Sequence, residues 1–420
     1  MKLHRLALWT GIGSGLEYYA FITFALQAKV LSILFFHQSD FALVNTFLIF
    51  AVGSVVTLFG GFFLGLFGDH LGRKKILLLS ITLMTLSTVA IGLLPTDLPF
   101  GLSIALLVLC RLVQGASVGG EIPGAIVFVY EHAHKNQIGF LLGILFLGVG
   151  LGAGVSTGVN ALVSACFSQA QILAFAWRIP FLLALFLGGA GYILRRKSTE
   201  SLAFQAYMTQ NESTAQTAIR PLRPLLLGAG LVFFPATLVS IGLYLPSYWM
   251  NHSTQNNEQI FLAMMLGFLL TALLLPLLGK LGDQIGRKKL YLWGIILSLL
   301  ALPFLMSLLR FDTPWALYAF NLIYYLLIVI MAACYPAILA SLFPIQYRYR
   351  FVALSYAGTY AIAGTAPFVM SLLIQHWNHP TTLLFFLFAT GCISLITGLL
   401  YTPEKSIIYK KNYCIFKKIL

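Results

Sequence analysis

Charged residues are scarce in this 420-residue chain. Only 9% of its residues are Asp, Glu, Lys or Arg, whereas ordinary soluble domains carry about 25%. Hydrophobic residues make up 59%. Because single water-soluble cores stop growing near ~250–300 residues, a chain this apolar could not cover its surface with polar groups. The composition therefore excludes an ordinary soluble enzyme and favours a polytopic α-helical membrane protein, since lipid is itself an apolar solvent.

The chain also lacks the patterns of disulfide, metal and catalytic sites. Its five cysteines include no CxxC pair and are typical of small buried hydrophobes. The apolar runs contain no nucleophile–base pair, and the HAH sequence at His132 and His134 has no further ligand nearby. We therefore expect no metal, no cofactor and no enzymatic activity.

Long apolar runs, by contrast, fill most of the sequence. A helix of about 20 mostly apolar residues crosses a bilayer, and about twelve such runs can be found. We predict an all-α membrane protein whose twelve transmembrane helices form two pseudo-symmetric six-helix bundles. The runs are residues 8–31, 44–67, 76–94, 104–130, 140–162, 180–194, 225–248, 260–278, 290–309, 315–342, 352–374 and 381–401.

Basic residues are distributed unevenly between these runs, which explains the net charge of +14. With the N-terminus in the cytoplasm, 22 of the 26 Lys and Arg residues, Arg195 among them, fall in cytoplasmic segments. Only Lys29, Arg178 and Arg310 fall outside. Cytoplasmic loops are enriched in Lys and Arg, so we predict that both termini are cytoplasmic and that no nucleic acid is bound.

The longest polar stretch divides the chain into two halves of six runs. We predict an N-terminal bundle at 1–194, a cytoplasmic linker at 195–223, a C-terminal bundle at 224–402 and a basic cytoplasmic tail at 403–420. Three charged residues stand out deep inside the runs, Glu17, Arg111 and Glu121, and such charges are functional candidates because they are costly at bilayer depth. Arg111 and Glu121 are too far apart for a direct pair, about 15 Å along one helix. An ion pair between Glu17 and Arg111 that merely joins helices is the alternative.

A motif repeats between the two halves. GLFGDHLGRKK at 65–75 corresponds to GKLGDQIGRKK at 279–289, each between the second and third runs of its half. The glycines allow a tight turn, and the aspartate can cap the next helix and pair with the arginine. The pattern resembles the signature loop of the major facilitator superfamily, and this resemblance implies that the two loops gate the cytoplasmic side. The predicted gating residues are Gly68, Asp69, Gly72 and Arg73 in the first copy and Gly282, Asp283, Gly286 and Arg287 in the second.

Two further stretches narrow the resemblance. RLVQGASVGGE at 111–121 and GSGLEYYAF at 13–21 resemble the metabolite:proton symporter family, which includes proline/betaine, citrate, 2-oxoglutarate and shikimate transporters. The resemblance implies uptake of a small carboxylate or zwitterion, driven by protons or sodium ions, by a monomer in a bacterial inner membrane. The aspartate usual in the first span is Ala20 here, so proton coupling would depend on Glu17, Glu121 and Arg111.

In this architecture the solute site lies midway across the membrane between the halves. Arginine can clamp a carboxylate, and tyrosine faces can hold a quaternary ammonium. For any single tyrosine, packing or interfacial anchoring is the alternative. The predicted solute-binding residues are Arg111, Gln114, Tyr18, Tyr19, Tyr244, Tyr248, Asn321, Tyr324, Tyr356 and Tyr360, and Tyr325 is a further candidate beside Tyr324.

Two other functions remain open. One is antiport that exports a drug or a siderophore. Drug antiporters usually carry a glycine–proline motif in the fifth span, and the absence of proline from 140–162 counts against this alternative. The other is a nutrient sensor that binds without transporting, which Ala20 keeps open.

Overall fold

The computed structural model describes residues 3–36, 39–96, 99–196, 222–377 and 381–402, and the described chain is helical with no β-strand. A helix or broken helix coincides with each predicted span. In the first half these are α1 (Leu3–Leu26) with α2 (Ala28–Phe36), α3 (Ala42–Leu71), α4 (Arg73–Leu93), α5 (Phe100–His132), α6 (Ile138–Cys166) and α8 (Ile179–Arg196), with the short α7 (Gln169–Ala174) between the last two. In the second half they are α10 (Leu222–His252), α11 (Asn257–Ile285), α12 (Arg287–Leu308), α13 (Pro314–Ala332) with α14 (Tyr335–Ser341), α15 (Arg348–Ala363) with α16 (Ala366–Trp377), and α17 (Thr381–Leu400).

Most of these helices are long and apolar enough to cross a bilayer unaided. Within the described ranges ten meet that standard, and the α1–α2 pair, bent by 55°, makes an eleventh span. The bend falls at Gln27, whose side-chain amide donates a hydrogen bond of 2.8 Å to Asn160 on α6. A polar anchor at the break is expected, because a broken helix in a membrane needs neighbouring polar groups to satisfy it.

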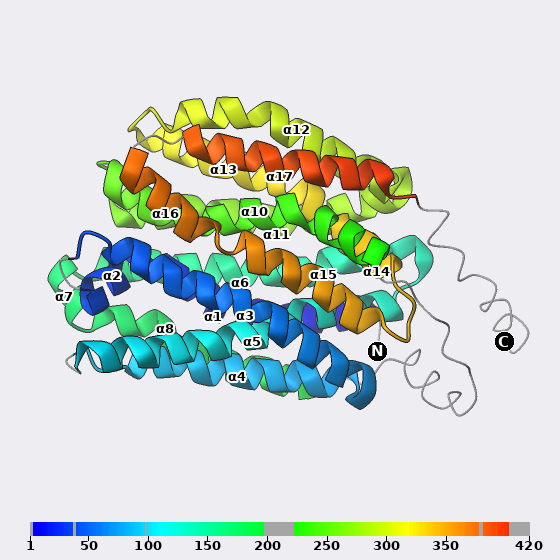
Figure 1. The fold of residues 1–420 in the computed structure, drawn as a ribbon, viewed down its shortest axis with the longest axis horizontal. Helices are drawn as coiled ribbons and strands as arrows, with labels where there is room; N and C mark the ends of the chain where they lie inside the picture. Colours follow the sequence, from blue (N-terminus) through cyan, green and yellow to red (C-terminus); the bar gives the residue numbers. More distant parts are fainter. Residues whose placement is uncertain (1–2, 37–38, 97–98, 197–221, 378–380, 403–420) are drawn as a thin grey trace, which may run out of the picture.

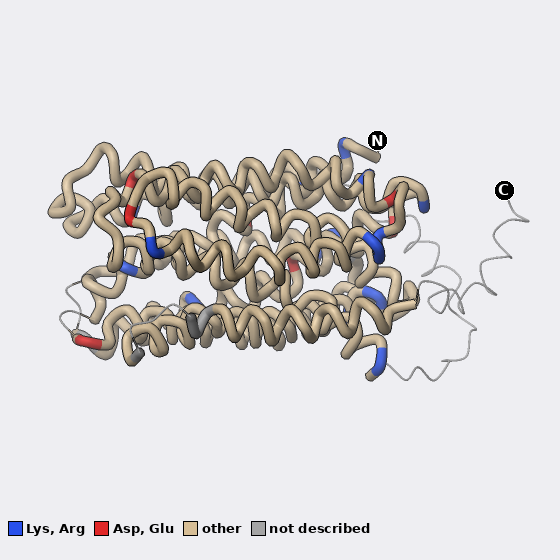
Figure 2. Tube along the Cα trace, turned by 90° about the horizontal axis from the view of Figure 1, so that it is seen from above, with Lys and Arg blue, Asp and Glu red and all other residues tan. Residues whose placement is uncertain are grey.

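The helices form two bundles that lie side by side (Figure 1). Helices α1–α8 make one bundle and α10–α17 the other, with α6 packed along α11 and α3 along α15. The start of α1 and the end of α17 lie at the same end of the molecule; we call it the termini end, and its opposite the far end. Figure 2 shows Lys and Arg gathered mainly at the termini end and few charges along the middle of the helices.

The repeated loops form the predicted turns at one glycine each. Gly72 and Gly286 separate α3 from α4 and α11 from α12, with φ of 98° and 101°, a region that favours glycine. Gly68 was predicted to help form the first turn, but it lies inside α3 instead, against the ring of Tyr349 on α15. Gly282 likewise lies within α11. One glycine in each motif therefore serves the turn, and Gly68 serves the contact between bundles.

Candidate functional site

Two buried carboxylates share one arginine inside the first bundle. Arg195, near the end of α8, donates to Glu121 on α5 through Nη1, at 2.8 Å from Oε2, and through Nη2 to Oε1. Its Nη1 also lies 3.6 Å from Oε2 of Glu17 on α1. Ser14 donates to Glu121 and Ser117 donates to Glu17, each at 2.8 Å. The side chains of both glutamates are 1% exposed and that of Arg195 is 3% exposed.

The charges of this cluster do not balance. With both glutamates ionised the three side chains carry one net negative charge, and an uncompensated charge in a low-dielectric interior is costly. Glu121 holds the bidentate arginine contact, whereas Oε2 of Glu17 accepts no hydrogen bond. One proton on the cluster makes it neutral, and Glu17 has the free oxygen to take it. Chemically, the arrangement can bind and release a proton.

Arg195 is the member of this cluster that the sequence reasoning missed. It was predicted to open the cytoplasmic linker at residue 195, but α8 continues to Arg196 and buries its side chain. A signal was present in the sequence. Gly188, Gly191 and Arg195 follow one another at helical spacing and are all buried on one face of α8.

Arg111, in contrast, lies apart from both glutamates. It is fully buried on α5, its Nη1 donates to Gln114 at 2.9 Å and to the carbonyl of Phe21 at 3.4 Å, and no carboxylate among the described residues pairs with it. The alternative of a Glu17–Arg111 ion pair is therefore not what the structure contains. Gln114 in turn donates to Thr88 at 2.7 Å.

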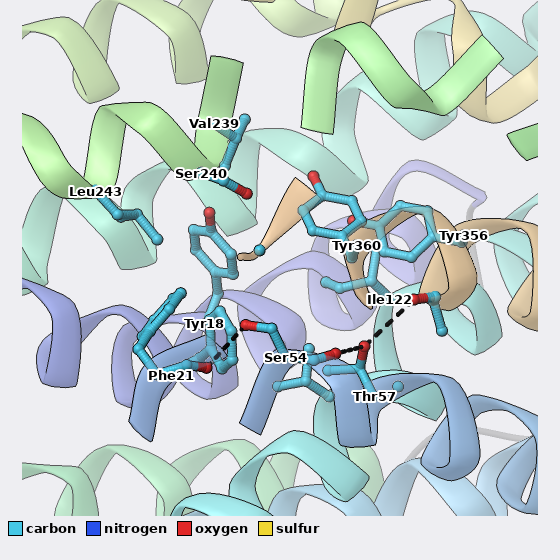
Figure 3. A pocket seen from close by; sticks show the side chains of 15 residues that line it. Tyr18, Phe21, Ser54, Thr57, Ile122, Val239, Ser240, Leu243, Tyr356 and Tyr360 are labelled. Carbon is cyan, nitrogen blue, oxygen red and sulfur yellow. Dashed lines mark hydrogen bonds between the residues drawn. The ribbon is translucent and has the colours of Figure 1, made fainter. Parts of the chain in front are cut away.

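A cavity lies between the bundles near mid-membrane (Figure 3). Its two adjoining lobes, a smaller one of about 510 Å³ and a larger one of about 650 Å³ when space open to the surroundings is counted, share a lining from α1, α5, α10 and α15. Figure 3 shows the smaller lobe. No Asp, Glu, Lys or Arg belongs to the described lining of either lobe. The residues common to both lobes are Tyr18, Ile122, Val239, Tyr356 and Tyr360.

Three of the predicted solute-binding tyrosines and the further candidate Tyr325 line this cavity, and the others do not. Tyr18, Tyr356 and Tyr360 do, and they are joined by Tyr325 and Tyr335 in the larger lobe. Tyr335 was not predicted. Three of the others donate side-chain hydrogen bonds to backbone carbonyls: Tyr19 to Pro180, Tyr324 to Leu238 and Asn321 to Leu317. The rings of the remaining two pack on neighbouring rings: Tyr244 on Phe47 and Tyr248 on His252.

At the termini end, the second signature loop ties the two bundles together. Asp283, on α11, accepts hydrogen bonds from the backbone N–H groups of Gly139 and Phe140 at the start of α6, at 2.9 and 3.0 Å. It also pairs with Arg287 at 2.6 Å. A carboxylate at a helix N-terminus meets both the free N–H groups and the helix dipole. Asp283 thus caps a helix of the other bundle; the side chains of Asp69 and Arg73 lie outside the described residues.

Further contacts join the bundles at both ends. At the termini end, Arg348 pairs with Glu131 at 3.3 Å, and the hydroxyl of Tyr349 donates to the carbonyl of Gly120 at 2.7 Å. At the far end, Lys29 donates to Asn251, and Gln375 donates to the carbonyl of Asp40 at 2.7 Å. The cavity therefore lies between two sets of contacts, one at each end.

Comparison with known proteins agrees with this architecture. The family model of Sugar (and other) transporter matches residues 10–226, and that of Major Facilitator Superfamily matches residues 225–412. The chain is 30% identical to the proline/betaine transporter of Escherichia coli K12, over 94% of this chain and 83% of that protein. It is also 30% identical to the glycine betaine/proline/ectoine/pipecolic acid transporter OusA of Dickeya dadantii, over 95% of this chain and 83% of that protein.

Solved structures show the same fold. The proton:xylose symporter XylE bound to 6-bromo-6-deoxy-D-glucose superposes with a TM-score of 0.76 at 17% identity, covering 94% of each chain. A D-xylose–proton symporter structure superposes with a TM-score of 0.70 at 18% identity, covering 94% of this chain and 96% of that chain. Two bundles of apolar helices, paired signature loops and relatives of nearly full length lead to one assignment: the chain is a multi-pass membrane transporter that belongs to the Major Facilitator Superfamily, a family of transporters rather than enzymes.

Proposed function

We propose that this protein takes up a small zwitterion or carboxylate, of the betaine or proline kind, by symport with protons across a bacterial inner membrane. It works as a monomer, with both termini in the cytoplasm. The orientation is supported by the excess of Lys and Arg at the termini end. The solute class is supported by the relatives named as proline/betaine transporters and by the lining of the cavity.

The observation that carries proton coupling is the pair of glutamates around Arg195. Two carboxylates and one guanidinium, all buried, are neutral only with one proton bound. Glu17, whose Oε2 accepts no hydrogen bond, is the proton carrier in this proposal. Glu121 and Arg195 position Glu17, and their charges determine the electrostatic cost of ionising it.

The cluster is also connected to the interface between the bundles. Tyr349, on the second bundle, donates to the carbonyl of Gly120, which directly precedes Glu121 on α5. A shift of α5 that follows protonation would therefore alter a contact at the termini end. This gives a physical path from the proton to alternating access, in which the bundles rock around a fixed central site.

The cavity is suited to a zwitterion with a bulky cation. Tyr18, Tyr356 and Tyr360 surround it with aromatic faces and hydroxyls, and its described lining contains no acidic residue that would pair with a simple amine. Aromatic faces attract quaternary ammonium groups. The solute's cationic end would sit among these rings.

Uptake into proteoliposomes tests the proposal. Labelled glycine betaine, proline, citrate, 2-oxoglutarate and shikimate are offered with an inward proton gradient and again with the gradient collapsed. Accumulation of glycine betaine or proline only with the gradient is the expected result. Uptake that ignores the gradient would refute coupling, and efflux driven by the gradient would favour export instead.

A further inference from the structure

Arg111 carries a buried charge that no acidic group in the described part of the chain balances. Its side chain is fully buried, and its Nε and Nη2 atoms donate no hydrogen bond. The two partners it has, the side-chain oxygen of Gln114 and the carbonyl of Phe21, are both neutral. A guanidinium has five N–H donors and stays charged in proteins, so this site lacks an anion.

Three aromatic rings surround the guanidinium in place of that anion. Its central carbon lies 4.3 Å from the ring centre of Phe50, 4.4 Å from that of Phe21 and 4.9 Å from that of Phe24. Ring faces attract a cation, which makes the buried position tolerable. They neutralise no charge, however, and the two free donor nitrogens remain.

Two of these rings also form the wall of the central cavity. Phe21 and Phe50 line the smaller lobe beside Tyr18, while Arg111 itself does not reach it. Figure 3 shows Phe21 next to Tyr18 at this wall. The side chains of Phe21 and Phe50 therefore contact both the cavity and the guanidinium. Rotation of either ring would let a group in the cavity meet the free donors of Arg111.

Position 20 strengthens the case that the anion comes from outside the chain. Glu17, Ala20, Phe21 and Phe24 follow helical spacing on one strip of α1, and this strip faces α5, where Glu17 contacts Ser117 and the phenylalanines hold Arg111. Ala20 is 2% exposed. A methyl group thus occupies the place on the strip from which a fixed carboxylate could have balanced Arg111.

We propose that Arg111 is a gated subsite for the carboxylate of the transported solute, and that Phe21 and Phe50 are its gate. This inference rests on the proposed function, which it deepens. The cationic end of the solute stays among Tyr18, Tyr356 and Tyr360, while its carboxylate passes the rings and fills the donors of Arg111. The solute itself then supplies the missing counter-charge, so a cation without a carboxylate binds poorly.

Ala20→Asp tests the proposal, with Ala20→Asn as its matched neutral control, in full-length protein in nanodiscs. The aspartate supplies a fixed counter-ion, so the ligand-free Asp variant should melt at a higher temperature than the Asn variant. Its affinity for glycine betaine should fall about 10- to 100-fold, the range for losing a hydrogen bond to a charged group. The Asn variant should bind within about threefold of wild type. Equal glycine betaine affinity in the Asp and Asn variants would overturn the proposal.

Arg111→Gln gives an independent readout with a pair of probes. Choline has the trimethylammonium group of glycine betaine but no carboxylate. Wild type should prefer glycine betaine, and Arg111→Gln should lose that preference while its choline affinity stays unchanged. A preference that survives in Arg111→Gln would overturn the subsite, as would a wild type that binds none of the carboxylates in the uptake panel.

The two proposals fail in different ways. Gradient-driven uptake together with solute binding that does not depend on Arg111 would refute the subsite proposal alone. Binding that depends on Arg111, together with uptake that ignores the gradient, would sink proton coupling and leave the subsite standing.

Discussion

Replacing Arg195 with glutamine should destabilise the protein by an amount that depends on pH. The substitution removes the bidentate partner of Glu121 and the only cation within 4 Å of Glu17 among the described residues. Breaking a buried ion pair on one side costs about 3–5 kcal/mol. A glutamate can limit this cost by taking up a proton, which for a model carboxyl costs about 3.7 kcal/mol at pH 7. Both estimates place the loss at about 3–4 kcal/mol at neutral pH.

The sign of the pH dependence follows from the extra proton. The folded variant binds one more proton than folded wild type, so its deficit should shrink as pH falls, by about 1.4 kcal/mol per unit. Reversible unfolding in mixed detergent micelles measures this between neutral and mildly acidic pH. Arg196→Gln is the matched control, because Arg196 is adjacent and exposed, and it should change stability by less than about 0.5 kcal/mol. A deficit that grows as pH falls, or an Arg195→Gln variant as stable as the control, would refute the reasoning.

Three other changes have outcomes that can be measured directly. Asp283→Asn should weaken the cap between the bundles by about 1 kcal/mol and raise the labelling rate of cysteines placed at the termini end of the cavity. Labelling equal to wild type would contradict the role of Asp283 in holding the bundles together at that end. Gly68→Ala should lower the melting temperature, because its methyl group would overlap the buried ring of Tyr349, and Tyr349→Leu in the same chain should recover part of the loss. Asp312, in the loop after α12, accepts backbone hydrogen bonds from Thr254 that lower its pKa. The folding stability that these bonds contribute is present above the unfolded pKa and is lost as pH falls through the lower folded pKa. Asp312→Asn should therefore make the melting temperature depend less on pH on the acid side.

The span pattern could be predicted because hydropathy and turn chemistry are local. Runs of apolar residues give the helices whatever their neighbours are, and Gly72 and Gly286 adopt the positive φ that the repeated motif indicates. The break at Gln27 was not predicted, since it depends on a partner 133 residues away on another helix. Short stretches of sequence therefore predict where helices lie along the chain, but they do not predict which helices pack together.

The candidate site shows the same division. Glu17 and Glu121 stand out because charges are rare inside spans, and the structure does bring them together around one arginine. That arginine was assigned to the linker because Arg195, Arg196 and Lys197 together resemble an ordinary basic helix end. The depth of α8 in the bundle distinguishes Arg195 from its neighbours, and the helical spacing of Gly188, Gly191 and Arg195 is the one sequence signal of it. Likewise, nothing in the sequence separates Tyr356, which lines the cavity, from Tyr324, which does not.

The measurement that tests proton coupling most directly compares accumulation with exchange in Glu17→Gln. Wild-type proteoliposomes with an inward proton gradient should concentrate labelled glycine betaine or proline, and the same vesicles preloaded with unlabelled solute should exchange it without a gradient. Glu17→Gln should lose gradient-driven accumulation yet retain exchange, because a permanently neutral side chain permits the loaded steps but carries no proton. Accumulation that persists in Glu17→Gln would contradict the account.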